Sequence, residues 1–256
     1  VYQSACATEG RKGSKLADLK SLVEAGVLAI TDDGSPIADD KIMKETLEVT
    51  AKLGVPVVQH CEIMSITNGG IMNEGEVSRR LGVKGISNAS EHEIIARDIE
   101  LTRQTPGAHY HIQHISTKEA VDLVRKAKAE GINVTAEACP HHFILDDTAI
   151  EKYGTNAKMN PPLRTAEDVN AVLEGIKDGT IEVICTDHAP HTADEKSQPL
   201  DKAPFGIVGL ETAIGLSYTY LVEKGLITLE EMINKMSVNP RRLLGLKDIS
   251  LKEGSM

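Results

Sequence analysis

At 256 residues the chain is long enough for one large α/β barrel domain, and its 41% hydrophobic and 26% charged residues are typical of a globular protein. Its apolar runs are shorter than the roughly 18 residues that a membrane helix needs, so we expect no membrane segment. The net charge of −10, without clusters of Lys and Arg, argues against a nucleic-acid partner.

Short runs rich in β-branched residues alternate with amphipathic stretches along the chain. This pattern is typical of repeated βα units on a parallel sheet. No linker divides the chain, so a single domain over residues 1–256 is expected. In chain order, the predicted strands are Tyr2–Thr8, Val27–Thr31, Val55–Gln59, His109–Ile115, Asn133–Ala138 and Glu182–Thr186.

Two of the intervening helices have clear start signals. Thr165 and Asp168 have the spacing of a capping box, and Ser116 and Glu119 have the same spacing. Gly131 is a predicted C-terminal stop for the earlier helix. The expected inner faces are Ala120, Val121, Val124 and Ala127 in that helix, and Val169, Val172, Leu173 and Ile176 in the later one.

The four cysteines, Cys6, Cys61, Cys139 and Cys185, are scattered without CxxC spacing. A disulfide framework is therefore not expected, and a reducing cytoplasm fits best. We interpret each cysteine as a buried small hydrophobe.

Polar motifs stand at the ends of the last five predicted strands. In parallel α/β sheets the active site lies at the carboxyl ends of the strands. Imidazole and carboxylate ligands together suit zinc and similar ions, which lower the pKa of bound water from 15.7 towards about 7. The motifs are Asp32-Asp33-Gly34, His60-Cys61-Glu62, His111-Ile112-Gln113-His114, His141-His142 and Asp187-His188-Ala189-Pro190-His191.

The strongest ligand candidates are His60 and His114, because they end two separate strands. Alternation along a regular strand puts His111 and His114 on opposite faces, so only one of them should face the barrel centre. Asp187 is placed to hold a water molecule and move its proton. Asp33 is open to two interpretations, a site carboxylate or part of a turn before glycine.

For His141, His142 and His188 the sequence favours a structural role. A single histidine at a strand end is more often a hydrogen-bonded core or loop residue than a ligand. Cys61 and Glu62 follow a candidate ligand and could orient it.

Together these residues resemble dihydroorotases of the bacterial class I type, in the amidohydrolase superfamily. The resemblance spans nearly the whole chain in six ordered motifs. These are Thr31-Asp32-Asp33-Gly34, His60-Cys61-Glu62, Tyr110-His111-Ile112-Gln113-His114-Ile115-Ser116-Thr117, Lys158-Met159-Asn160-Pro161-Pro162-Leu163-Arg164, Thr186-Asp187-His188-Ala189-Pro190-His191 and Ala203-Pro204-Phe205-Gly206.

The resemblance implies a (β/α)8 TIM-type barrel that binds one or two Zn²⁺ ions. Asp33 would take the place of the carboxylated lysine of many relatives, His60 and His114 would be metal ligands, and Asp187 would be both a ligand and the catalytic acid/base. The implied reaction is the reversible hydrolysis of dihydroorotate to N-carbamoyl-aspartate in pyrimidine synthesis. The implied substrate-binding groups are Asn160, His191 and the backbone of Phe205 and Gly206.

The chain departs from the family at its first strand. Members open with a His-x-His-x-Arg motif that supplies two metal ligands and a substrate arginine, and this sequence has none. Its first strand matches the family's third, which predicts a partial catalytic barrel of strands 3–8, truncated at both ends. The strands at Tyr2–Thr8 and Glu182–Thr186 would then be open edges, so we expect the chain not to be autonomous.

Two alternatives remain open from the sequence. Hydantoinases and allantoinases share the fold and the cyclic-amide chemistry, although they generally keep the bridging lysine where this chain has Asp33. A non-catalytic homologue could instead serve as a partner of aspartate transcarbamoylase, with which some dihydroorotases associate. A homo-oligomer is also possible.

Overall fold

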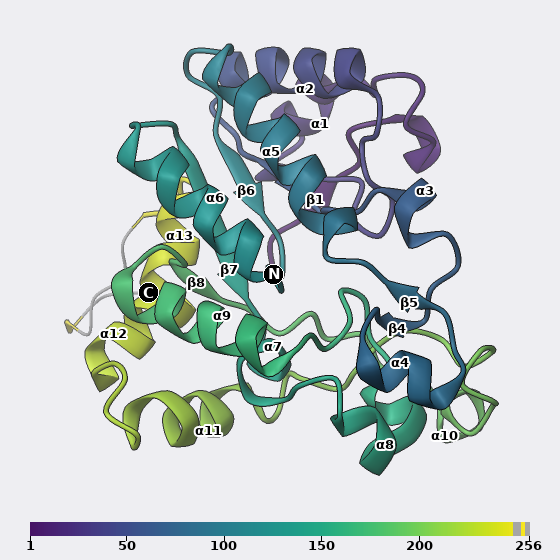
Figure 1. Ribbon diagram of the computed structural model, residues 1–256. Helices are drawn as coiled ribbons and strands as arrows, with labels where there is room; N and C mark the ends of the chain where they lie inside the picture. The colour runs from purple at the N-terminus through teal and green to yellow at the C-terminus, as the bar shows by residue number, and fades with distance from the viewer. Residues whose placement is uncertain (248–251, 254–256) are drawn as a thin grey trace.

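The computed structural model describes residues 1–247 and 252–253. Its main sheet has six parallel strands in the order β1-β2-β3-β6-β7-β8, and Figure 1 shows them surrounded by helices. Every strand lies inside a predicted run, so the six βα units in sequential order are confirmed, with shorter strands than expected. The strands are β1 (Ser4–Ala5), β2 (Ala29–Ile30), β3 (Val57–Gln59), β6 (Tyr110–Ile112), β7 (Val134–Ala138) and β8 (Val183–Ile184).

One layer of helices follows the strands in chain order, and each helix packs on the next. The core lies between this layer and the sheet, where Ile30, Val57 and Ile112 meet Leu47 and Val121. The layer therefore fixes the spacing of the strands and of their carboxyl ends. Its members are α1 (Leu19–Glu24), α2 (Asp40–Leu53), α5 (Ala89–Arg103), α6 (Lys118–Ala129) and α9 (Ala166–Asp178).

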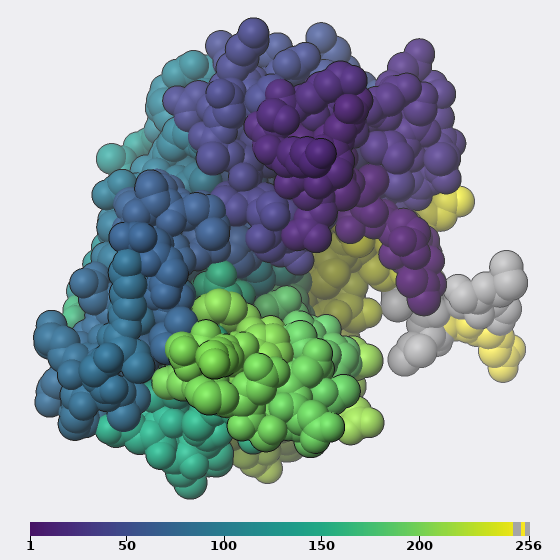
Figure 2. Space-filling model, turned by 90° about the vertical axis from the view of Figure 1, so that its right-hand side faces the viewer, coloured from purple at the N-terminus to yellow at the C-terminus, as the bar shows by residue number. Residues whose placement is uncertain are grey.

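A second, smaller unit was not predicted from the sequence. Two parallel strands, β4 (Met72–Asn73) and β5 (Gly85–Ile86), pair beside α3 (Met64–Thr67) and α4 (Glu76–Leu81). Two-residue strands give too short a pattern for sequence periodicity to detect. The segment after β8, light green in Figure 2, lies on the surface beside the blue segment that contains α4.

The remaining elements are short. They include two π-helical stretches, at Tyr218–Val222 and Asn234–Val238, and two 3-10 turns, at Glu9–Arg11 and Gly154–Ala157. None of the helices in the described part of the chain is long and apolar enough to cross a membrane. The short α-helices are α7 (Pro140–Ile144), α8 (Ala149–Tyr153), α10 (Ala193–Lys196), α11 (Ala213–Ser217), α12 (Leu229–Ile233) and α13 (Asn239–Leu243).

The predicted helix starts are half right. Thr165 and Asp168 form the expected capping box of α9. At α6, however, the N-cap is Thr117, whose hydroxyl accepts from the Ala120 N–H, and the prediction of Ser116 was wrong by one residue. The reason is tertiary: the Ser116 hydroxyl donates to the buried Glu91 carboxylate instead.

The two margins of the sheet are β1 and β8, as predicted. On the β8 side, two side chains from the C-terminal helices donate hydrogen bonds to backbone carbonyl oxygens. Lys235 Nζ donates to the Ile181 oxygen at 2.6 Å, and Asn239 Nδ2 donates to the Glu182 oxygen at 2.9 Å. These contacts cover part of an edge that would otherwise offer carbonyls to another chain. Among the cysteines, Cys61 and Cys139 are buried as expected, whereas Cys6 and Cys185 are half-buried.

The sheet interior makes stability sensitive to acid. His109 and His111 both contact the Thr135 hydroxyl at 2.8 Å, and burial, followed by repulsion from His111, lowers the pKa of His109 to about 4. The unfolded chain thus binds more protons than the folded chain below pH 6.5, so the free energy of unfolding should fall as the pH drops from 6.5 towards 4. Urea unfolding at pH 7 and pH 5 should show a smaller drop for His109→Gln than for His92→Gln, the matched control on α5. Equal drops in both variants would contradict the assignment.

Candidate metal and catalytic site

The carboxyl ends of β2, β3 and β6 bring Asp33, His60 and His114 together, with their ligand atoms within 4.8 Å of one another. His60 Nδ1 lies 3.1 Å from His114 Nε2, and Asp33 Oδ1 lies 3.8 Å from each of these nitrogens. Ligands about 2.0–2.2 Å from one tetrahedral ion are separated by about 3.4 Å. Two imidazoles and a carboxylate at this spacing fit a single zinc-sized ion.

The backbone turns His114 towards this cluster. Regular pairing of β6 ends at Ile112, and His114 has the left-handed φ of 32°. Uncommon φ values of this kind in non-glycine residues often mark functional sites. The His111 side chain lies on the same face of the sheet as Thr135 and Glu137 of the neighbouring strand β7, and its Nε2 lies 3.1 Å from Glu137 Oε2. The alternation of side chains along β6, which predicted that His111 and His114 lie on opposite faces, therefore ends before His114.

The Asp32-Asp33-Gly34 motif forms a turn, and the same turn brings the Asp33 carboxylate beside the two histidines. Asp32 is buried, and its carboxylate accepts from the backbone N–H and the hydroxyl of Thr8. Its carbonyl accepts from the Ser35 N–H at 2.8 Å in a turn where Gly34 has a φ of 74°. This anchored turn leaves the Asp33 side chain 47% exposed at the edge of the cluster.

Glu62 orients His60. The Glu62 carboxylate lies 3.1 Å from His60 Nε2 and also accepts from Thr67 and from Asn160 Nδ2, at 2.6 and 3.0 Å. Burial alone would raise the pKa of Glu62, but the hydrogen bonds from His60 and Thr67 bring it below the ordinary value. An ionised carboxylate only accepts, so Nε2 carries the proton and the lone pair of Nδ1 faces the cluster. Cys61 instead contacts the Tyr110 hydroxyl, at 3.1 Å.

Asp187 follows β8 in a left-handed conformation, with a φ of 44°. Burial raises its pKa, the imidazole of His114 opposes this, and the carboxylate of Asp33 raises it further. These interactions place Asp187 in the electrostatic field of the cluster. A carboxyl group with a raised pKa can both take and return a proton more readily near neutral pH.

The four predicted substrate-binding residues fall into two groups. Asn160 touches the cluster directly, since its Nδ2 lies 3.5 Å from His60 Nε2. His191, Phe205 and Gly206 lie together: His191 Nε2 is 2.9 Å from the Phe205 oxygen, and the Gly206 N–H donates to the Lys158 oxygen at 3.0 Å. Lys158 is two residues from Asn160, so one segment links the two groups. His191 and Gly206 line a cavity of about 220 Å³.

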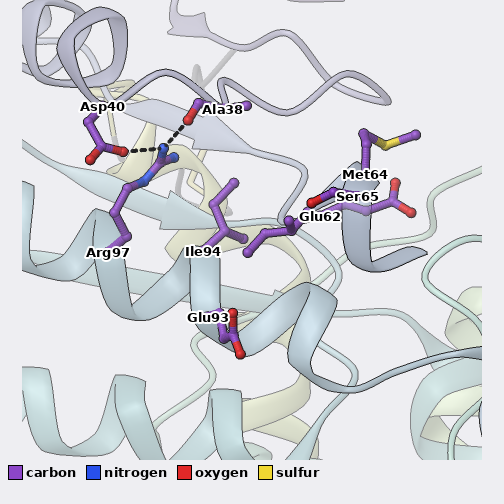
Figure 3. Close-up of a pocket in the computed structure, with 9 residues that line it drawn as sticks. Ala38, Asp40, Glu62, Met64, Ser65, Glu93, Ile94 and Arg97 are labelled. Atoms are coloured by element: carbon purple, nitrogen blue, oxygen red, sulfur yellow. Dashed lines mark hydrogen bonds and ion pairs between the residues drawn. The ribbon is translucent and has the colours of Figure 1, made fainter. Parts of the chain in front are cut away.

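A larger cavity, of about 470 Å³, lies on another side of Glu62. Figure 3 shows the Arg97 side chain on its wall, reaching Asp40 and the Ala38 carbonyl. The guanidinium also pairs with the buried carboxylate of Asp98 at 2.8 Å. The positive charge of Arg97 is thus paired with the carboxylates of Asp40 and Asp98.

Two residues near the site were not singled out in advance. Glu137 on β7 was missed, although Thr135 and Glu137 alternate with apolar residues in the sequence and share the face that meets His111. Arg164 is buried, and it donates to the Ser116 hydroxyl and to the Ile86 carbonyl. His188 is structural as predicted, because its Nδ1 accepts from the N–H groups of Gly209 and Leu210 at 3.2 Å.

Comparison with solved structures gives the class of fold. The L-hydantoinase (dihydropyrimidinase) from Arthrobacter aurescens matches 99% of this chain with a TM-score of 0.83 and 24% identity, over 58% of its own length. The D-hydantoinase (dihydropyrimidinase) from a Thermus species matches 96% of the chain with a TM-score of 0.74 and 26% identity, over 56% of its length. The chain therefore has the TIM-barrel fold of the amidohydrolases, as a partial barrel.

Sequence comparison is more specific. Residues 1–120 match the dihydro-orotase-like family. The dihydroorotase of Pelotomaculum thermopropionicum is 49% identical over 255 residues, covering 100% of this chain and 60% of the relative. That of Acetivibrio thermocellus is 46% identical over 254 residues, covering 99% and 59%. The chain is thus similar to dihydroorotases along its whole length, and it spans about 60% of the length of these relatives.

Loss of the Glu62 charge should weaken metal binding. Glu62→Gln keeps the shape but removes the charge and replaces one of the two acceptor oxygens, which serve His60, Asn160 and Thr67, with an NH2 donor. Changes of this kind typically cost about 10–100-fold in metal affinity. We expect the Kd for zinc, measured by competition with a chromophoric chelator, to rise within that range. Glu93→Gln, exposed on α5, is the matched control and should bind like the unmodified chain. An unchanged Kd in Glu62→Gln would show that Glu62 does not orient His60 for metal binding.

Proposed function

We propose that this protein is a metal-dependent hydrolase that converts dihydroorotate reversibly to N-carbamoyl-aspartate in pyrimidine synthesis. The observation that carries the proposal is the cluster of Asp33, His60 and His114 at one sheet edge, with the Asp187 carboxyl within range of its charges. The names of the relatives supply the substrate. Zinc is the proposed ion, because two imidazoles and a carboxylate form a donor set that it favours.

In this proposal Asp33, His60, His114 and Asp187 hold the ion. A bound zinc ion would polarise the ring carbonyl and lower the pKa of the attacking water. Asp187 takes the proton that water loses as its oxygen bonds to the ring carbon. It then gives that proton to the ring nitrogen as the amide C–N bond breaks, so the carboxylate is regenerated.

The substrate is held by the two groups of polar residues described above. Asn160 would turn its amide from Glu62 and His60 towards the dihydropyrimidine ring. His191 and the backbone of Phe205 and Gly206 would orient the ring and its carboxylate. Gly206 has a φ of 145°, and a Cβ there would lie 2.4 Å from the Ala189 oxygen, so only glycine fits this position.

Three further features belong to the proposal. The ion count is one or two, and the cluster supplies ligands for one. A homo-oligomer or aspartate transcarbamoylase would be the protein partner. The cytoplasm is the proposed location, since pyrimidine synthesis and four cysteines without a disulfide spacing both suit it.

Removing the proton carrier should lower turnover far more than zinc content, because Asp33, His60 and His114 remain as ligands. Hydrolysis of dihydroorotate is measured with zinc added, and Asp187→Asn should lower kcat by about 10²–10⁴-fold, the usual contribution of acid/base catalysis. The measurement is the absorbance change of the substrate, together with zinc content. Asp122→Asn, an exposed carboxylate on α6, is the matched control and should keep full activity.

The same assay separates the alternatives. Faster hydrolysis of hydantoin or allantoin than of dihydroorotate would replace the proposed substrate. Bound zinc without turnover of any of the three, combined with binding to aspartate transcarbamoylase, would favour a non-catalytic partner. A chain that binds no zinc would overturn the ligand set.

A further inference from the structure

A second group of potential ligands lies at the end of β7. Cys139 directly follows this strand, and His141 and His142 lie in α7 (Figure 1). The ligand atoms of these three residues lie within 4.8 Å of one another. All three are buried, with exposed fractions of 0%, 6% and 2%. They share no residue with the cluster of Asp33, His60 and His114, although His141 and His142 lie near enough to His114 to interact with its charge.

Hydrogen bonding fixes the orientation of the His142 ring. His142 Nε2 lies 2.9 Å from the Pro161 carbonyl oxygen. A carbonyl only accepts, so Nε2 carries the proton and Nδ1 carries a lone pair. Metal-binding histidines are commonly held in this way, with the second nitrogen donating to a carbonyl or carboxylate.

Two buried nitrogens of the group have no hydrogen-bond partner. Among the described residues these include His142 Nδ1 and His141 Nε2. Buried polar atoms are normally paired, and an unpaired one in a folded protein calls for a partner such as an ion. The centroids of the two imidazole rings lie 4.3 Å apart, which is close enough for both rings to bind the same ion.

We propose that Cys139, His141 and His142 form a second metal site that binds a zinc-class divalent ion. One thiolate and two imidazoles are ligands for zinc or cobalt and not for magnesium or calcium. Ligand atoms about 2.0–2.3 Å from an ion lie roughly 3.5 Å apart, so binding requires only a small contraction of the group. The site stands on these three residues alone and does not depend on the proposed reaction.

A cavity lies on one side of the group. His141 lines this cavity of about 200 Å³, whose walls are mostly apolar side chains such as Ile144, Leu145 and Ile207. Three protein ligands leave a fourth coordination position open, which a water molecule can fill in a zinc site.

The neighbouring thiol of Cys185 is a rival ligand. Its Sγ lies 3.3 Å from Cys139 Sγ, but Cys185 is not part of the group whose ligand atoms converge. The proposal assigns the sulfur ligand to Cys139. Substitution of each cysteine in turn separates the two assignments.

Cobalt(II) gives the test a readout that is independent of activity. The full 256-residue chain, reduced and free of metal, is titrated with Co²⁺, and bound thiolate is detected by its sulfur-to-cobalt charge-transfer band in the near ultraviolet. We expect this band in the unmodified chain and in the double variant His60→Asn, His114→Asn, which lacks the first cluster. Cys139→Ser should abolish the band, whereas Cys185→Ser and the matched control Cys6→Ser should keep it.

Substitution of the histidines tests the remaining ligands. His141→Asn and His142→Asn should each weaken Co²⁺ binding, followed by the same band, by at least about 10-fold, and far-ultraviolet circular dichroism checks that every variant is folded. Absence of the band in the unmodified chain would overturn the proposal. So would a band that survives in Cys139→Ser, or one that disappears when only the first cluster is removed.

Discussion

The parallel direction of the six main strands is the constraint on which the site depends. Because every strand points the same way, their carboxyl ends meet at one edge, and residues 27 to 154 positions apart in sequence become neighbours there. Asp33, His60 and His114 arrive from three successive strands of the sheet. The buried layer of α2, α5, α6 and α9 holds these strands at a fixed spacing, so burial of apolar side chains also sets the distances between ligands.

The left-handed backbone at His114 is held by a network behind the site. Glu91 is buried on α5, and its carboxylate accepts from the backbone N–H groups of Ser116 and Thr117 at 3.0 and 2.9 Å. Arg164 donates to the Ser116 hydroxyl at 3.1 Å and to the Ile86 carbonyl at 2.7 Å. An uncommon φ persists when the surrounding structure over-determines it. Here the small sheet of β4 and β5, joined through Arg164, contributes to that constraint.

The sequence predicted the parts of the molecule in which pattern and chemistry coincide. The six strands have β-branched runs long enough to recognise, and His60 and His114 stand where those runs end. It could not decide the role of Asp33, because a turn residue and a ligand use the same Asp-Gly pattern. It misplaced the N-cap of α6, because the choice between Ser116 and Thr117 depends on Glu91, which lies 25 residues away from Ser116. Contacts of this kind, and pairs as short as β4 with β5, leave no local periodicity.

The two clusters differ in their exposure and in the polar groups around them, and these decide what a bound ion can do. The first has Asp33 at 47% exposure, Asn160 in contact and Asp187 nearby, so an ion there would have both an approach for a polar substrate and a proton carrier. The second lies among buried side chains and faces a mostly apolar cavity. An ion at Cys139, His141 and His142 would instead tie the end of β7 to α7. Since β7 also supplies Glu137 to His111, and β6 continues from His111 to His114, such a tie would stabilise the strand pair that supports the first cluster.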